Sequence, residues 1–176
     1  AQSGWIAIAQ KSDQSYNLQF ENGNEPTFTI YDDDWNTVNS GVSLTNDQWH
    51  HIVGTYDGDE ARIYVNGTLE NTQTVSGTMA NASGSPLGIG ENLADTGRTL
   101  DGSIDELRVY DQALSTGEVE TLYNVQSGNH TSGWRRAPRA TRHPRCARRA
   151  AAAGWWCSWT RRRGWSTAPS GAPETT

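Results

Sequence analysis

Apolar and polar residues alternate with a period of two through much of the first 110 positions. Tyr16, Leu18 and Phe20 fall on one face of an extended segment, with polar residues between them. Residues 4–10 and 27–32 show the same alternation. Such a pattern is typical of antiparallel strands that are buried on one face, so it predicts a β-rich domain.

Turn signals divide this region into short strands. Residues 49–75 predict three strands joined by tight hairpins at 57–59 and at Asn66-Gly67. An Asn-Gly pair suits the two left-handed positions of a type I′ turn. Residues 86–92 and 102–111 supply two further predicted strands.

Only residues 115–124 have a helical pattern. Ser115 is a suitable N-cap, and Glu118 three residues later completes a capping box. Val119 and Leu122 then lie on one face of the helix. One short helix after about eight strands predicts an all-β protein, a two-sheet antiparallel sandwich of the jelly-roll type.

Charge divides the chain near residue 127. Residues 1–127 hold 19 acidic and 4 basic side chains, a net charge of −15, whereas residues 128–176 hold 10 Arg and one Glu, a net charge of +9. The second segment contains no Leu, Ile, Val or Phe, so it cannot build a core of its own. We therefore expect a domain at 1–127 and an irregular, low-complexity tail at 128–176, rich in Arg, Ala and Trp.

Three interpretations of the tail stay open. Its composition matches a GC-rich gene read in a shifted frame, which we favour, or a naturally disordered segment. Its interleaved Arg and Trp residues could also contact nucleic acid, but only this basic tail favours such a partner, and we do not expect one. On any of these interpretations, removal of the tail should leave the stability of the domain unchanged. No apolar run reaches the roughly 18 residues of a membrane span.

The motifs of the domain resemble a known family. The runs DQWHHIVGTYDGDEARIYVNGTLE (47–70), LGIGEN (87–92) and LDGSIDELRVYDQALSTGEVETLYN (100–124) are similar to the laminin-G-like, concanavalin A-like lectin/glucanase domains. The resemblance covers about Trp5 to Asn124 and implies a jelly-roll sandwich with Trp49 packed in its core. Members of this family usually open with a further segment that carries the first strands. We therefore expect the chain to be truncated at its N-terminus.

The resemblance does not extend to catalysis. The glucanases of this fold carry Glu-x-Asp-x-x-Glu on one strand, whereas Ser103 and Arg108 occupy the outer positions here. Asp105 and Glu106 are neighbours on a strand and should project to opposite sides, yet glycoside hydrolysis needs two carboxyl groups that converge on one bond. We predict no catalytic residues and no enzymatic activity, although the chain could be a fragment appended to an enzyme.

A metal site has one candidate. Asp105 matches the acid of the family's G-x-I-D-E segment, where the resemblance implies either capping of backbone amides or a place in a calcium site. Calcium prefers several hard oxygen ligands, so a structural calcium ion is the only cofactor suggested and none is certain. His50 and His51 are adjacent on a strand and should point to opposite faces, which excludes a shared metal ion.

The run Asp32-Asp33-Asp34-Trp35-Asn36 is the most unusual local feature of the domain. It should form a loop at the rim of the sandwich, where an exposed Trp offers a flat apolar face to sugar rings and Asp and Asn bond their hydroxyls. We therefore consider a ligand site. The alternative is a solvated acidic turn in which Trp35 covers a sheet edge. The candidate ligand-binding residues are Tyr31, Asp33, Asp34, Trp35 and Asn36.

Together these features predict a non-catalytic binding module of a secreted or cell-surface protein. We expect it to recognise carbohydrate, with an extracellular protein surface as the other partner class. The alternative is a structural spacer or adhesion domain with no ligand of its own. In either case we expect an extracellular or cell-surface location.

Overall fold

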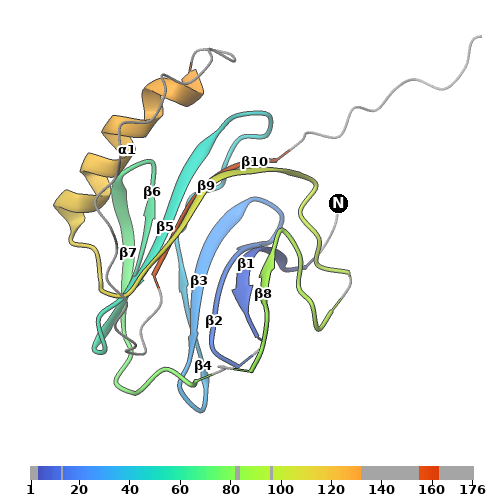
Figure 1. Ribbon diagram of the computed structural model, residues 1–176, viewed down its shortest axis with the longest axis vertical. Coiled ribbons are helices and arrows are strands. Elements are labelled where there is room, and N and C mark those ends of the chain that lie inside the picture. The colour runs from blue at the N-terminus through green and yellow to red at the C-terminus, as the bar shows by residue number, and fades with distance from the viewer. Residues whose placement is uncertain (1–3, 13, 82–83, 96, 132–154, 163–176) are drawn as a thin grey trace, which may run out of the picture.

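The structure is a computed structural model that describes residues 4–12, 14–81, 84–95, 97–131 and 155–162. These residues form two antiparallel sheets, packed face to face, and one helix (Figure 1). From edge to edge, the first sheet contains β4 (Trp35–Asn39), β3 (Glu25–Tyr31), β2 (Tyr16–Glu21), β1 (Ile6–Lys11) and β8 (Leu87–Ile89). The second contains β7 (Thr68–Thr74), β6 (Glu60–Val65), β5 (His50–Tyr56), β10 (Trp155–Arg162) and β9 (Gly102–Tyr110). The predicted all-β sandwich is confirmed.

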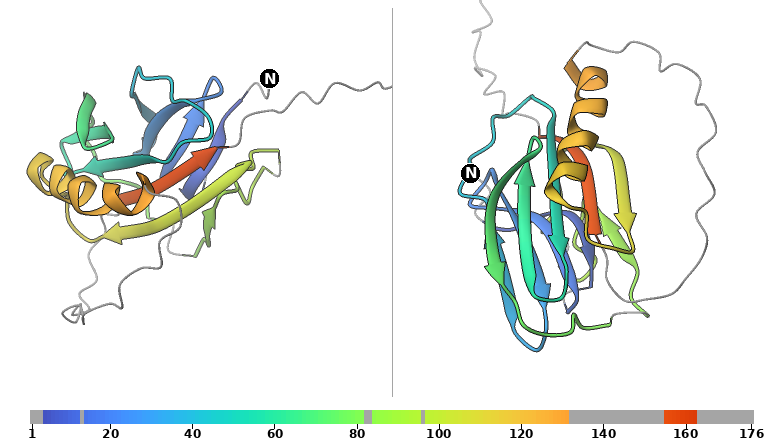
Figure 2. Two further views of the ribbon diagram at one scale, coloured as in Figure 1. Left: turned by 90° about the horizontal axis from the view of Figure 1, so that it is seen from above. Right: turned by 90° about the vertical axis from the view of Figure 1, so that its left-hand side faces the viewer.

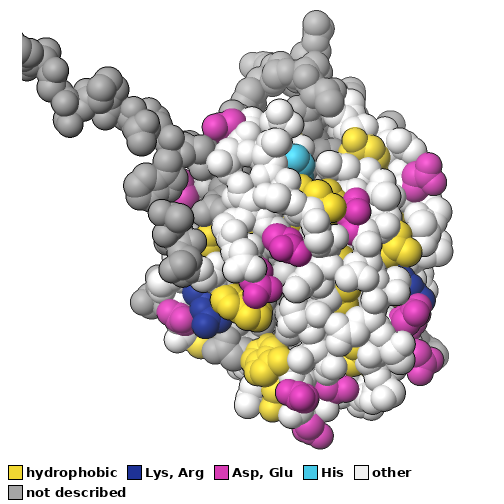
Figure 3. Space-filling model, turned by 180° about the vertical axis from the view of Figure 1, so that it is seen from behind, with side chains coloured by type: hydrophobic (Ala, Val, Ile, Leu, Met, Phe, Trp, Pro, Cys, Tyr) yellow, Lys and Arg dark blue, Asp and Glu magenta, His cyan; other side chains and the backbone are white. Residues whose placement is uncertain are grey.

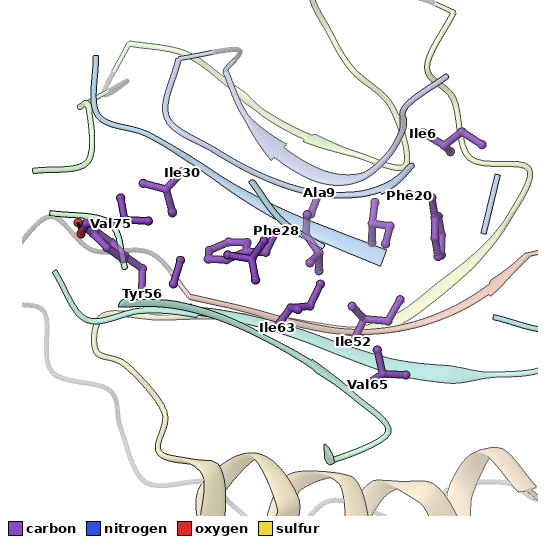
Figure 4. Close-up of a cluster of buried hydrophobic side chains, with 14 of the residues drawn as sticks. Ile6, Ala9, Phe20, Phe28, Ile30, Ile52, Tyr56, Ile63, Val65 and Val75 are labelled. Carbon is purple, nitrogen blue, oxygen red and sulfur yellow. Dashed lines mark hydrogen bonds between the residues drawn. The ribbon is translucent and has the colours of Figure 1, made fainter. Parts of the chain in front are cut away.

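The core lies between the two sheets. Figure 4 shows Phe28 and Ile30 of the first sheet facing Ile52 and Ile63 of the second. All four side chains are fully buried, as the period-two pattern predicts for inward-facing positions. The two sheets lie close together at Gly54 of β5, since a Cβ atom built there would lie 2.4 Å from Cδ2 of Phe28.

The predicted hairpin at Asn66-Gly67 is confirmed. Asn66 has φ of +50° and Gly67 of +82°, so both central residues are left-handed as a type I′ turn requires. The turn pairs Val65 of β6 with Thr68 of β7. It also brings the hairpin under the helix, since a Cβ atom on Gly67 would lie 2.9 Å from Cδ1 of Tyr123.

Helix α1 (Thr116–Thr131) covers the outer face of the second sheet (Figure 2). The predicted capping box is present: the Ser115 amide donates to Glu118 Oε2 at 2.8 Å, and the Glu118 amide donates to Ser115 Oγ at 3.4 Å. Val119 packs with Val53 and Tyr64 in a small cluster between the helix and the sheet. Among the described residues, no helix is both long enough and apolar enough to cross a bilayer.

The expected boundary at residue 127 differs from the structure. Gly128 lies inside α1, and residues 155–162 of the expected tail form β10 between β5 and β9. Main-chain hydrogen bonds to two neighbours hold such a strand, and these need no branched aliphatic side chain. The effect of removing the tail on the stability of the domain stays a prediction, and the place of β10 between β5 and β9 is a physical reason for a loss of stability. The rest of the tail, Cys146 included, lies outside the described residues.

One core expectation also changes. Trp49 is half-buried in the segment before β5 and does not belong to the core between the sheets. The core side of this strand is filled instead by Ile52 and Tyr56. Because β5 begins only at His50, the position of Trp49 is not fixed by the alternation of the strand.

Candidate functional site

The acidic run lies in a β-hairpin and not in a long loop. Trp35 and Asn36 open strand β4, and only Asp32, Asp33 and Asp34 form the turn from β3. Asp33 has φ of +83°, a conformation that Asp tolerates better than most residues, and the Asp32 amide donates to the Asp34 carbonyl at 3.2 Å. Three consecutive acids conceal the start of β4 in the sequence pattern.

An aromatic pair stands at the end of this hairpin. Tyr31 and Trp35 are register partners, and their rings meet edge to face with centroids 5.0 Å apart at 63°. Tyr31 is fixed on both sides, because its amide donates to the Ser15 carbonyl at 2.8 Å and its carbonyl accepts from Ala80 at 2.9 Å. Trp35 remains 46% exposed. The pair therefore presents an apolar face on a rigid support.

The polar candidates of the same run act mainly within the turn. Asp34 Oδ1 accepts the Trp35 amide at 2.8 Å, and Asn36 Nδ2 donates to Asp32 Oδ1 at 2.5 Å. Asp33 is exposed at the tip of the hairpin. Of the five candidate ligand-binding residues, Tyr31 and Trp35 lie beside a groove, whereas Asp33, Asp34 and Asn36 are not among its lining residues.

This groove has a volume of about 620 Å³. Tyr31 and Trp35 line one part of the groove. Residues at the end of β1, in the segment after it and in the segments around β8 line the rest. The sequence pattern did not indicate these residues, because only the fold brings them next to the hairpin. The described lining residues are Gln10, Ser12, Gln14, Tyr31, Trp35, Ser85, Pro86, Asn92, Leu93 and Ala94.

The segments around β8 that line the groove are held by backbone hydrogen bonds and a close turn. Asn92 is buried, and its Oδ1 accepts the amides of Ala94 at 2.8 Å and Asp95 at 3.1 Å. Gly88 permits the close turn, since a Cβ atom there would lie 2.5 Å from the Glu91 carbonyl oxygen. Lys11 Nζ of β1 donates to the Ser85 carbonyl. The groove is thus largely formed before any ligand arrives.

The lining combines apolar surface with neutral polar groups. Leu93 is 50% exposed and faces the same groove as Trp35. Gln14 adds an exposed amide, whereas Gln10 and Asn92 are buried, and no charged side chain is among the described lining residues. Acidic groups are instead spread over the surface; Figure 3 shows them on one face, with few Lys or Arg among them. Such a groove can stack a flat apolar ligand and exchange hydrogen bonds with hydroxyl groups.

The metal candidate Asp105 lies elsewhere, on β9 of the second sheet. It is exposed, and its Oδ1 accepts the Glu106 amide at 2.8 Å. Glu106 has φ of +52° beside a register shift between β9 and β10, so simple alternation does not apply here, and it pairs with Arg108 at 2.6 Å. Within the described ranges, no group of three or more His, Cys, Asp or Glu side chains could hold a metal ion. The hydrogen bond from the Glu106 amide to Asp105 Oδ1 is the geometry of the amide-capping alternative.

The prediction for the two histidines is confirmed. His51 stacks on Tyr123 of α1, with ring centroids 5.9 Å apart, on the outer face of the sheet. On the other face, His50 Nε2 donates to the Thr45 carbonyl at 3.0 Å. The two rings therefore cannot share a metal ion.

Comparison with known proteins places the chain in a family. Residues 1–120 match the model of the family Laminin_G_3, described as the concanavalin A-like lectin/glucanases superfamily, and the chain belongs to this superfamily. No curated protein matches the chain significantly. Among solved structures, it is similar to residues 221–444 of an S-layer domain-containing protein from Clostridium thermocellum, with 26% identity and a TM-score of 0.40. That match covers 68% of this chain and 63% of the other.

Proposed function

We propose that this domain is a non-catalytic binding module of a secreted or cell-surface protein, and that it binds neutral carbohydrate in the groove between Trp35 and Leu93. The observation that carries the proposal is the groove itself, which the exposed Trp35 lines together with the exposed Gln14 and Leu93. The superfamily to which the chain belongs includes lectins, in agreement with this assignment.

The chemistry of the groove favours sugars over other ligands of similar size. A pyranose ring has an apolar face of C–H groups, which the Trp35 ring can cover, and a rim of hydroxyls that act as both donors and acceptors. The side-chain amide of the exposed Gln14 matches this dual character, because it offers both a donor and an acceptor. The groove volume of about 620 Å³ lies within the usual range of small-ligand sites.

Charge favours a neutral glycan. The described lining residues carry no cation that could pair with a sulfate or carboxylate. Residues 1–127 have a net charge of −15, so an anionic polysaccharide approaching the domain is repelled. A neutral glucan needs no cation in the groove and is not repelled by the net charge of the domain.

A binding role, and not hydrolysis, is favoured by the placement of the acids. Glycosidases use two carboxyl groups about 5–9.5 Å apart on either side of the scissile bond. No carboxylate is among the described residues that line the groove, and Glu106 belongs to the other sheet, where it pairs with Arg108. A sugar seated beside Trp35 therefore meets no acid–base pair there.

Calorimetry on the full chain tests the proposal. The probes are laminarihexaose and cellohexaose as neutral glucans, with a heparin hexasaccharide as the anionic control. The change Trp35→Ala should lower the affinity for a bound neutral glucan about tenfold, since one stacked ring contributes on the order of 1 kcal/mol or more. Two control variants, Glu106→Gln and Asp33→Asn, should bind as the wild type does, because neither residue lines the groove.

Each other outcome contradicts a defined part of the proposal. Unchanged affinity in the Trp35→Ala variant rejects the site. Preference for the heparin fragment rejects the assignment to neutral glycans. Absence of binding to any member of a glycan array favours the alternative of a spacer domain without a ligand.

A further inference from the structure

Strand β10 has an unusual position in the second sheet. It pairs on one side with β5, where Thr160 opposes His50, and on the other with β9, where Arg162 opposes Gly102. The match to the family model ends at residue 120, so β5 and β9 lie inside the family domain and β10 lies outside it. The position between β5 and β9 in this sheet is therefore filled by a segment that is not part of the matching domain.

Between β5 and β9 there is room for one strand. Neighbouring strands lie about 4.8 Å apart, so two strands that flank a third leave a slot of about 9–10 Å with main-chain donors and acceptors on both edges. Every residue of β5 is buried, and its unpaired groups would be costly if the slot were empty. A slot of this kind binds an extended segment through its backbone, as in strand addition to a sheet.

The described part of β10 indicates that the backbone supplies the fit. Thr160 is 1% exposed, and its hydroxyl has no hydrogen-bond partner within the described ranges. The pairing with β9 also shifts register between Cys157 and Trp159. The hydroxyl of Thr160 therefore adds no hydrogen bond to the main-chain pairing, and a strand paired through its main chain can be replaced by an identical one.

We propose that the slot between β5 and β9 is a strand-acceptor site, and that residues 155–162 of a second copy of this chain fill it, so that two copies join by exchanging β10. Two features of the sequence support a second copy as the occupant in place of the strand of the same chain. The 23 residues between Thr131 and Trp155 can extend over roughly 75 Å, which is long enough to reach a neighbour. The net charge of +9 on residues 128–176 attracts this segment to the body of another copy, whose net charge is −15.

Exchange is favoured further by its symmetry. A swapped strand makes the same backbone pairs in the partner as in its own chain, so the dimer forms without any new kind of contact. The site is independent of the groove beside Trp35, which belongs to the hairpin of the other sheet. Loss of glycan binding would therefore leave this inference intact.

Native Cys157 allows a direct test on the full chain. Its register partner on β9 is Arg108, and cross-strand Cα atoms lie about 4.5–5.5 Å apart, within disulfide range. A donor chain carries Cys146→Ser and keeps Cys157. An acceptor chain carries Cys146→Ser, Cys157→Ser and Arg108→Cys, together with a tag that changes its mass.

The two folded chains are mixed without denaturant, oxidised, and analysed on a non-reducing gel. Exchange predicts a covalent heterodimer whose yield rises with protein concentration and exceeds, by at least tenfold, that of an acceptor with Val125→Cys in place of Arg108→Cys. Val125 is 72% exposed on α1 and reports random collision.

A single chain with Cys146→Ser and Arg108→Cys completes the design, because it reports the strand of the same copy. Suppose that this chain cross-links within itself and that the heterodimer forms no more than with the Val125→Cys control. This result shows that β10 pairs within its own chain, and it overturns the proposal. Absence of cross-linking in both arrangements shows that β10 does not occupy the slot, which overturns it as well.

Discussion

Gly54 lies where a strand of the second sheet packs tightly against Phe28 of the first, and replacing it by Ala tests the packing of the core. An ideal Cβ atom at this position lies 2.4, 2.5 and 2.8 Å from Cδ2, Cγ and Cε2 of Phe28. Carbon atoms prefer separations of about 3.5–4.0 Å, so the ring has to move by about 1 Å or the sheets have to separate. Phe28 is fully buried between both sheets and has no free volume into which to turn.

The expected cost follows from these distances. Overpacking of a closed core costs about 1–3 kcal/mol, which exceeds the roughly 0.4–1 kcal/mol that Ala gains over Gly by restricting the unfolded chain. We therefore expect Gly54→Ala to lower the free energy of unfolding by about 1–2 kcal/mol. For a domain of this size, the melting temperature should fall by about 3–8 °C.

Urea denaturation followed by circular dichroism measures this change, with Gly117→Ala as the matched control. Gly117 lies in the first turn of α1, and a Cβ atom added there would meet no heavy atom within 4 Å, so the same substitution should stabilise the helix by about 0.5–1 kcal/mol. Adding Phe28→Leu to Gly54→Ala should cost less than the sum of the two single changes, because Leu lacks the ring atoms that clash. A Gly54→Ala variant as stable as the wild type would refute this description of the core.

Two further changes test local electrostatics and capping. Ser115→Ala removes the N-cap of α1 and should lower the free energy of unfolding in urea by about 1 kcal/mol; an unchanged midpoint would show that the capping box with Glu118 does not hold the helix. Burial raises the pKa of Asp57, but its bonds with Arg62 and with nearby amides outweigh this and hold the pKa below the ordinary 3.8. A lowered folded-state pKa means stability that is present above pH 3.8 and lost as the pH falls through the folded value. Wild type should therefore exceed Asp57→Asn in stability at about pH 6 by more than at about pH 2.5, and an equal difference at both would contradict the ion pair's role.

Local sequence signals predicted the parts of this fold that are held by local chemistry. The Asn66-Gly67 pair supplies the two left-handed residues of a type I′ turn, and Ser115 with Glu118 satisfies the first amides of a helix. Each of these motifs is formed by a few residues that are close together in the sequence. The alternation in β2 and β3 likewise shows directly which side chains enter the core.

Other elements depend on partners distant in the sequence. β10 contains no Leu, Ile, Val or Phe, and β5 and β9 offer it main-chain bonds on both edges. The start of β4 at Trp35 was concealed by the acids of the turn. Of the residues that line the groove, the sequence indicated only Tyr31 and Trp35, because the segment around Leu93 is brought beside them by the tertiary fold. Long-range pairing of this kind leaves little trace in a local pattern.

The most direct test of the proposed function is an NMR titration of the uniformly labelled full chain with laminarihexaose and cellohexaose. Binding in the groove predicts that the largest shifts fall on the indole N–H of Trp35 and the backbone amides of Tyr31, Gln10 and Leu93, which line both walls. The amides of β9, including Glu106, should not move, because this strand belongs to the other sheet. Shifts centred on β9, or saturating binding that leaves Trp35 and Leu93 unmoved, would contradict a carbohydrate site in this groove.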